Sequence, residues 1–143
     1  MATLEKALEI ASRAHAGQVD KAGHPYILHP IRVMLAVSTL EESIAAVLHD
    51  TVEDTEITPG DLESAGFSRQ IIDAVQALTK KEGESRLDAA RRAVANPVAR
   101  QVKLADVADN MDLERIPNPT ARDYERLEEY KQVRELLLAG PQG

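Results

Sequence analysis

The sequence predicts an all-α protein that folds as a single helical bundle. Apolar residues recur through most of the chain at the three- and four-residue spacing of one helix face. In addition, no segment of strand length alternates apolar and polar residues. A chain of 143 residues has the size of one domain with one core, so we expect a single domain over residues 1–143.

The first three helices are placed by a capping residue, a glycine and a proline. Residues 4–16 form the first predicted helix, with Thr3 as its N-cap and Gly17 at its end. An irregular loop follows. The second helix covers residues 30 to about 40, and its opening proline suits a first turn, where the missing N–H is not needed. The third covers about residues 42–49.

The middle of the chain contains three shorter helices. Thr58 is expected to cap a helix with proline in its first turn, and Gly66 closes that helix. Ser68 caps the next helix, whose apolar residues lie between 71 and 78. Residues 86–94 are amphipathic, and an Asn-Pro pair ends that helix.

A loop with two prolines separates the last two helices. The first of these runs from Val98 to about Leu113, and the loop covers residues 117–119. Thr120 opens the final helix, which a Gly-Pro pair at residues 140–141 stops. All elements predicted from the sequence are therefore helical.

Composition excludes several kinds of partner. With 43% hydrophobic and 29% charged residues, no membrane-length apolar run and no basic-then-apolar leader, we expect a cytoplasmic protein without membrane contact. A net charge of −7 argues against binding a nucleic-acid backbone. Zero cysteines exclude disulfides and thiolate ligands, so nitrogen and oxygen atoms must hold any metal. The sequence carries no signature of a particular oligomeric state.

Two histidines and two aspartates stand out because each lies in apolar sequence. His49 and Asp50 are adjacent at the end of an apolar stretch, Asp106 ends the run Val-Lys-Leu-Ala-Asp, and His29 precedes a proline. Imidazoles and carboxylates together suit Mn, Fe or Zn. Taken alone, Asp106 would be a buried salt-bridge partner, but the set predicts a buried metal site.

Glu53 and Asp54 form a second acidic pair just after the His-Asp pair. Adjacent helical residues diverge by about 100°, so His49 and Asp50 converge only if the helix ends there and the backbone turns. We therefore expect Glu53 and Asp54 in a loop, from which they could handle a metal-bound water. This combination favours an enzyme.

Other polar residues have simpler interpretations. His15 and His24 are expected to be surface or hydrogen-bonding histidines rather than ligands. The Lys80–Lys81 pair would usually be a solvated charge pair. The acidic residues of the last helix are expected on its exposed face, namely Glu125, Glu128 and Glu129.

The order His…His-Asp…Asp on a helical frame resembles the HD-domain metal-dependent phosphohydrolases. Four blocks narrow the resemblance to the hydrolase domain of RelA/SpoT proteins: AHAGQ (14–18), PYILHP (25–30), LHDTVEDT (48–55) and VKLAD (102–106). The similarity spans nearly the whole chain, and the second and third blocks together are highly specific. With no room for a synthetase domain, the chain resembles a stand-alone small alarmone hydrolase.

This resemblance implies hydrolysis of the 3′-diphosphate of nucleotides such as (p)ppGpp, with release of pyrophosphate and use of one Mn²⁺. Glu53 and Asp54 match the acidic pair that orients and deprotonates the attacking water. The metal ligands implied by the motifs are His29, His49, Asp50 and Asp106.

The resemblance also implies a set of substrate contacts. Lys21 matches a cation at the mouth of the site that contacts phosphate, and Asn110 matches a residue on the ribose side. Arg126 and Tyr130, four residues apart on one helix face, match an Arg and a Tyr that contact substrate. Lys80 or Lys81 supplies a further phosphate contact, for which Lys81 is the candidate.

Two positions depart from the family pattern. Asp20 stands where relatives often carry a basic residue, which in animal relatives lies against guanine. Asp112 also replaces a common basic residue. Because an aspartate cannot stack on a base as a cation does, guanine preference is in doubt, and (p)ppApp becomes a serious candidate.

Two alternatives to this function remain. The first is an HD-domain enzyme that hydrolyses another nucleotide phosphomonoester or triphosphate. The second is a degenerate HD domain that binds a nucleotide or a partner as a sensor. The complete set of proposed ligands and acids favours an enzyme, because a binding module does not need a water-activating pair.

Overall fold

The computed structural model describes residues 2–141. Within that range the regular elements are helices, and the one β-type pairing is an isolated bridge between Val19 and Pro25. The elements are α1 (Leu4–Ala14), α2 (Leu28–Ala36), α3 (Leu40–Leu48), α4 (Thr51–Asp54), α5 (Pro59–Ser64), α6 (Arg69–Leu78), α7 (Arg86–Val94), α8 (Pro97–Asn110), the short 3₁₀ helix η1 (Leu113–Arg115) and α9 (Ala121–Ala139). The predicted all-α fold is confirmed.

Side-chain caps set most helix starts, as the sequence predicts. Thr3, Thr58, Ser68 and Thr120 each accept a hydrogen bond from a backbone N–H in the first turn of the following helix. Such a bond satisfies one of the donors that have no partner within the helix. In α5 and α9 a first-turn aspartate bonds back to the cap and completes a capping box.

The boundary between α2 and α3 differs from the prediction. Helix α2 begins at Leu28 and ends at Ala36, before the expected end near Leu40. The cause is Thr39, which accepts from the Glu42 N–H while the Glu42 side chain bonds to the backbone of Thr39. This capping box starts α3 at Leu40 and so ends α2 early.

Two other helix ends also come earlier than expected. Helix α1 ends at Ala14, with His15 as its C-cap, and Gly17 follows with a φ of 85°. Helix α8 ends at Asn110 instead of near Leu113, because the Asp112 side chain caps the separate helix η1.

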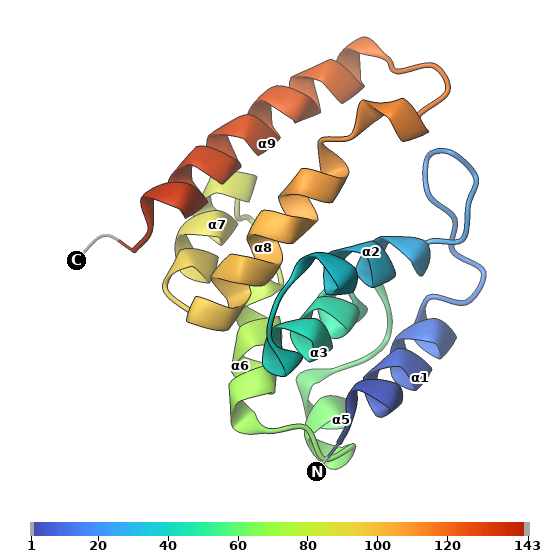
Figure 1. Ribbon diagram of the computed structural model, residues 1–143, viewed down its shortest axis with the longest axis vertical. Coiled ribbons are helices and arrows are strands. Elements are labelled where there is room, and N and C mark those ends of the chain that lie inside the picture. Colours follow the sequence, from blue (N-terminus) through green and yellow to red (C-terminus); the bar gives the residue numbers. More distant parts are fainter. Residues whose placement is uncertain (1, 142–143) are drawn as a thin grey trace.

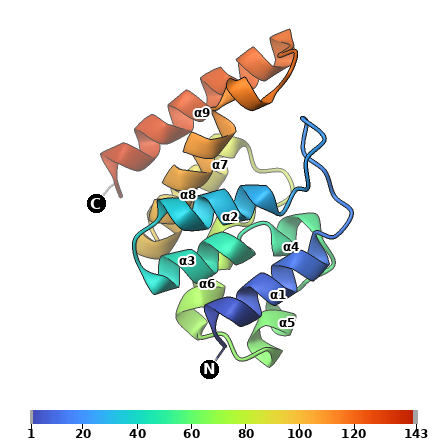
Figure 2. The same cartoon turned by 45° about the vertical axis from the view of Figure 1, so that its right-hand side comes forward.

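Helix α3 lies at the centre of the molecule. It contacts α1, α2, α6 and α8, and α9 packs on α7 and α8 (Figure 1). The loop between α1 and α2 extends toward the start of α9, where Lys21 of the loop pairs with Asp123 (Figure 2). No helix within residues 2–141 has the length and apolar character needed to cross a bilayer.

The core consists of three buried clusters that α3 and α8 connect. The first joins α1, α3, α5 and α6, the second joins α2, α3, α6, α7 and α8, and the third joins α7, α8 and α9. Residues 44–48 of α3 are all buried, with Leu48 completely inaccessible. The end of α3 is therefore a rigid base for the residues that follow it.

We expect Leu48→Ala to lower the free energy of unfolding by about 2–5 kcal/mol, because it removes fully buried methyl groups and leaves a cavity. Urea unfolding followed by circular dichroism measures this loss. The matched control is Leu35→Ala on α2, where the leucine is 74% exposed, so a change within about 0.5 kcal/mol is expected. Equal losses in both variants would contradict the central role of α3.

Candidate functional site

A break in the helix at the end of α3 turns two adjacent side chains toward the same point. The helical bonding of α3 ends at Leu48, and Asp50 has φ −98° and ψ −3°. The predicted break is therefore present. The prediction that Glu53 and Asp54 lie in a loop is wrong, because both residues lie in the short helix α4. This helix begins with the hydrogen bond from the Asp54 N–H to the Asp50 carbonyl.

The structure brings together the four side chains predicted as metal ligands. His29 comes from α2, His49 and Asp50 follow α3, and Asp106 comes from α8. His49 Nε2 lies 3.1 Å from Asp50 Oδ2 and 3.3 Å from Asp106 Oδ1. His29 Nε2 lies 2.9 Å from Asp106 Oδ1 and 3.6 Å from Asp50 Oδ2. Three elements therefore converge on one small volume.

The donor atoms of this cluster fit a divalent metal ion. His29, His49 and Asp50 offer ligand atoms within 4.8 Å of one another. His49 Nδ1 donates to the Ala46 carbonyl at 2.5 Å, so its Nε2 faces the cluster. Imidazole nitrogens with carboxylate oxygens form a donor set of the kind that binds first-row divalent ions.

The electrostatics of the cluster favour positive charge at its centre. Burial alone would lower the pKa of His49, but the Asp50 and Asp106 carboxylates hold it well above its usual value. Burial would likewise raise the pKa of Asp106, yet Lys103 and both imidazoles hold it well below its usual range. The salt bridge expected of a buried aspartate is also present, with Lys103 Nζ 2.9 Å from Asp106 Oδ2.

A second group of side chains supports the cluster from the α1 side. The Tyr26 hydroxyl donates to Asp50 Oδ2 at 2.6 Å, and burial together with Asp50 raises the pKa of this phenol. The His15 ring lies 5.1 Å from the Tyr26 ring, centroid to centroid. His15 is 2% exposed, so the surface interpretation is wrong, whereas its bond to Gln18 matches the hydrogen-bonding one. The Gln18 side chain also donates to the Asp54 carbonyl.

Glu53 and Asp54 face a cavity of about 280 Å³, called here the inner cavity. Glu53 Oε1 accepts from the Lys80 backbone N–H at 2.7 Å. Desolvation in the cavity, followed by repulsion from Asp50 and Glu53, raises the pKa of Asp54 to about 6. The cationic side chains that line this cavity are Lys80, Arg86 and Lys103.

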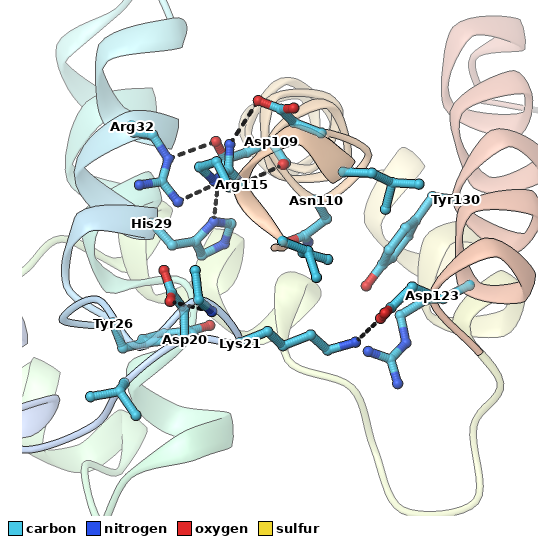
Figure 3. A pocket seen from close by; sticks show the side chains of 16 residues that line it. Asp20, Lys21, Tyr26, His29, Arg32, Asp109, Asn110, Arg115, Asp123 and Tyr130 are labelled. Atoms are coloured by element: carbon cyan, nitrogen blue, oxygen red, sulfur yellow. Dashed lines mark hydrogen bonds and ion pairs between the residues drawn. The ribbon is translucent and has the colours of Figure 1, made fainter. Parts of the chain in front are cut away.

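A second cavity of about 300 Å³, called here the outer cavity, lies between His29 and the first turns of α9 (Figure 3). The side chains common to both cavities are Tyr26, His29, Asn110 and Tyr130. Of the predicted ligands, His29 lines both cavities, and Asp50 and Asp106 line the inner one, so one extended molecule could occupy both cavities and pass beside these side chains.

The predicted substrate contacts fall at different places around these cavities. Lys21 and Arg126 line the outer cavity, and Lys21 forms an ion pair across it with Asp123 (Figure 3). Asn110 and Tyr130 line both cavities, and the Asn110 side chain donates to Asp106. All of these predicted positions face the site.

Lys81 is not brought to the site. Its neighbour Lys80 lines the inner cavity, while the Lys81 backbone N–H donates to Glu84. Arg92 explains this geometry, because it holds the carboxylate of Glu84 through two nitrogens and also donates to the Thr79 carbonyl. The loop after α6 is thereby fixed with Lys80 inward.

The two residues that depart from the family pattern have local partners. Asp20 Oδ1 accepts hydrogen bonds from the backbone N–H groups of Ala22 and His24, so Asp20 fixes the conformation of its own loop. In that loop the His24 side chain is exposed, as expected for a surface histidine. Asp112 caps η1 and pairs with Arg115. Both aspartates line the outer cavity.

Sequence reasoning missed several residues that touch the site. Tyr26 lies in the PYILHP block, but no role for it was predicted from the sequence. Arg86 is the first residue of α7, and its guanidinium lies 5.2 Å from the centre of the Tyr130 ring. Asp109 contacts His29 Nδ1 at 2.6 Å and pairs with Arg32. Burial opposes ionisation of Asp109, yet the bonds to His29 and Arg32 lower its pKa to about 2.

Comparison with known families and structures agrees with this geometry. The profile of the HD domain family matches residues 7–140. A solved structure of a metazoan ortholog of SpoT, described as hydrolysing ppGpp, has a TM-score of 0.76 and 26% identity to this chain. That match covers 97% of this chain and 85% of the other.

Relatives of known name are similar over different lengths. The guanosine-3′,5′-bis(diphosphate) 3′-pyrophosphohydrolases of Mus musculus and Homo sapiens are each 36% identical over 157 residues, covering 99% of this chain and 86% of theirs. A GTP pyrophosphokinase of Streptomyces coelicolor is 35% identical and covers 94% of this chain. This chain spans only 12–16% of the length of such long bacterial relatives.

We expect Asp50→Ala to abolish stoichiometric binding of a divalent metal, because it removes the carboxylate that contacts both imidazoles. Calorimetric titration with Mn²⁺ measures the stoichiometry. Asp73→Ala is the matched control, since Asp73 is exposed on α6 and pairs with Arg69. A full equivalent of metal on the Asp50 variant would show that the ligand assignment is wrong.

Proposed function

The chain belongs to the HD domain family, and from this premise we propose that it is a metal-dependent nucleotide 3′-pyrophosphohydrolase acting on (p)ppGpp, (p)ppApp or both. The observation that carries this proposal is the cluster of His29, His49, Asp50 and Asp106 beside the inner cavity, with His29 also lining the outer one. The names of the mouse and human relatives support the substrate class.

We propose Mn²⁺ as the ion of this site, held by the same four side chains. When bound, such an ion supplies Lewis-acid chemistry, which acidifies water and offsets charge on a diphosphate. The mixture of imidazole and carboxylate donors supports Mn²⁺ over a metal ion that binds oxygen ligands alone. Tyr26 keeps Asp50 in position by donating to Oδ2, so Asp50 presents its carboxylate toward the imidazoles.

Asp54 and Glu53 handle the proton of the attacking water in this proposal. A carboxyl group with a pKa of about 6 is a stronger base than an ordinary aspartate and is still mostly ionised at neutral pH. Glu53 is fixed by the Lys80 N–H, so it can orient water without moving. Gln18 holds the backbone of Asp54 from the opposite side.

The two cavities accommodate the two ends of the substrate. The inner cavity receives the 3′-diphosphate, where Lys80 and Arg86 offset its charge. The outer cavity receives the nucleoside, with Asn110 toward the ribose and Arg126 and Tyr130 along one wall. The water oxygen forms a bond to the phosphorus next to the ribose, the bond to the 3′ oxygen breaks, pyrophosphate leaves, and the 3′ oxygen gains a proton.

One experiment separates this function from the alternatives. Mn²⁺-loaded protein is incubated with ppGpp, ppApp, GTP and dGMP, and the products are resolved by chromatography. Pyrophosphate from the 3′-diphosphate nucleotides alone supports the proposal. Products from GTP or dGMP instead indicate another HD-domain hydrolase, and binding without any product indicates a sensor.

We expect Glu53→Gln and Asp54→Asn to keep the metal and lose about 100- to 10,000-fold in turnover, as is typical when a general base is removed. Turnover of ppGpp and ppApp and Mn²⁺ stoichiometry are measured on the same preparations. Glu56→Gln is the matched control, because Glu56 is exposed and lines neither cavity. Near-normal turnover in both site variants would remove Glu53 and Asp54 from the mechanism.

We expect comparable or faster hydrolysis of ppApp than of ppGpp, measured as kcat/KM, because Asp20 provides no cation to lie against guanine. Asp20→Arg should improve use of ppGpp. Since Asp20 also fixes its loop, Asp20→Asn is the control that keeps an acceptor oxygen and removes the charge. A wild-type preference for ppGpp above tenfold, about 1.4 kcal/mol, would contradict this expectation.

A further inference from the structure

The two histidines of the cluster have their second ring nitrogens bonded in different ways. His49 Nδ1 donates to the Ala46 carbonyl, a backbone acceptor supplied by α3 itself. His29 Nδ1 instead lies 2.6 Å from Oδ2 of Asp109 on α8. Because an ionised carboxylate only accepts hydrogen bonds, this nitrogen donates to Asp109. Without a metal, Nε2 likewise faces a carboxylate, Asp106; in a neutral ring that ligates a metal, the proton on Nδ1 leaves the lone pair on Nε2.

The two carboxylates that are hydrogen-bonded to His29 come from one face of α8. Asp106 and Asp109 are three residues apart, so their side chains lie side by side on the helix. Asp106 Oδ1 meets Nε2 at 2.9 Å, while Asp109 Oδ2 meets Nδ1. One helix therefore contacts both nitrogens of a single imidazole and fixes the plane and direction of the ring.

Asp109 is itself held in place by two arginines (Figure 3). Arg32 donates through Nε to Oδ1 at 2.8 Å and through Nη2 to Oδ2 at 3.1 Å. Arg115 Nη2 donates to the Asp109 carbonyl at 2.7 Å and lies 3.3 Å from Oδ2. The Asp109 side chain is 11% exposed, so few other orientations are open to it.

We propose that Asp109 is a positioning residue for the metal site: it fixes His29 with Nε2 toward the cluster, and Arg32 and Arg115 fix Asp109. This inference rests on the proposed function. A carboxylate on the far nitrogen of a ligating histidine sets its tautomer, increases its basicity, and is usually worth a factor of about 10 to 100 in metal affinity.

The test is Mn²⁺ affinity of the whole protein, measured by calorimetric titration for wild type, Asp109→Ala and Asp109→Asn. We expect about 10- to 100-fold weaker binding for Asp109→Ala. Asp109→Asn should retain most of the affinity, because the amide oxygen still accepts from Nδ1. Thermal unfolding without metal reports any general loss of structure. A purely structural role would instead lower the thermal stability of metal-free Asp109→Ala along with its Mn²⁺ affinity.

Asp112→Asn is the matched control, because Asp112 lines the same cavity, pairs with the same Arg115, and has no contact with His29. Its Mn²⁺ affinity should stay within about threefold of wild type, a margin below the 10-fold effect of a supporting residue. If Mn²⁺ affinity is weakened equally in the Asp109→Ala and Asp112→Asn variants, the loss comes from the changed charge of the cavity, and the proposal is overturned.

The remaining outcomes are also decisive. Wild-type affinity in Asp109→Ala would overturn the positioning role while leaving the metal site intact. Absence of Mn²⁺ binding in wild type would instead overturn the metal site of the proposed function. If Asp109→Ala does not fold, Asp109→Leu takes its place, and full affinity in that variant would overturn the proposal.

Discussion

Burial of Asp106 is the constraint on which the rest of the site depends. A carboxylate with 5% of its surface exposed must be paired and hydrogen-bonded to remain charged inside a protein. Its partners come from three parts of the chain: His29 on α2, His49 after α3, and Lys103 and Asn110 on α8 itself. Satisfying this carboxylate therefore fixes how α2, α3 and α8 pack.

The same constraint explains why α3 is short and ends in a buried segment. The residue after its last turn must lie within hydrogen-bond distance of Asp106, so the helix has to stop at Leu48 and not continue into α4. Small side chains at Ala45 and Ala46 allow α2 and α8 to approach α3 closely. The break then places His49 and Asp50 on the same side, which a continuous helix would not do.

Helix ends were predictable where a local side chain determines them. Thr58, Ser68 and Thr120 cap helices by bonding within one turn, so neighbouring residues contain the whole signal. The capping box from Thr39 to Glu42 carries the same kind of signal, and the prediction missed it. Helix α4 was not predictable in this way, because four residues are too few for a clear apolar pattern.

Within the site, predictability followed the range of the interactions. The apolar sequence neighbours of His49, Asp50 and Asp106 indicated that these polar side chains are buried. The motif resemblance then predicted that all three are metal ligands. The bond between Asp109 and His29 joins residues 80 positions apart and depends on the packing of α2 against α8. The inward position of Lys80 depends equally on a distant contact, since Arg92 on α7 fixes its loop.

Charge balance distinguishes the two cavities and constrains how a nucleotide can enter. In the outer cavity three of the four cations have carboxylate partners, with Lys21 on Asp123, Arg32 on Asp109, and Arg115 on Asp109 and Asp112, while Arg126 forms no ion pair within the described part of the chain. A phosphate that binds Lys21 must therefore displace Asp123, which reduces the net gain from that contact. In the inner cavity Lys80 forms no ion pair among the contacts described for residues 2–141, and Arg86 pairs only with the half-exposed Glu129. Phosphate can therefore bind Lys80 without displacing a carboxylate, which supports the proposed placement of the 3′-diphosphate in the inner cavity.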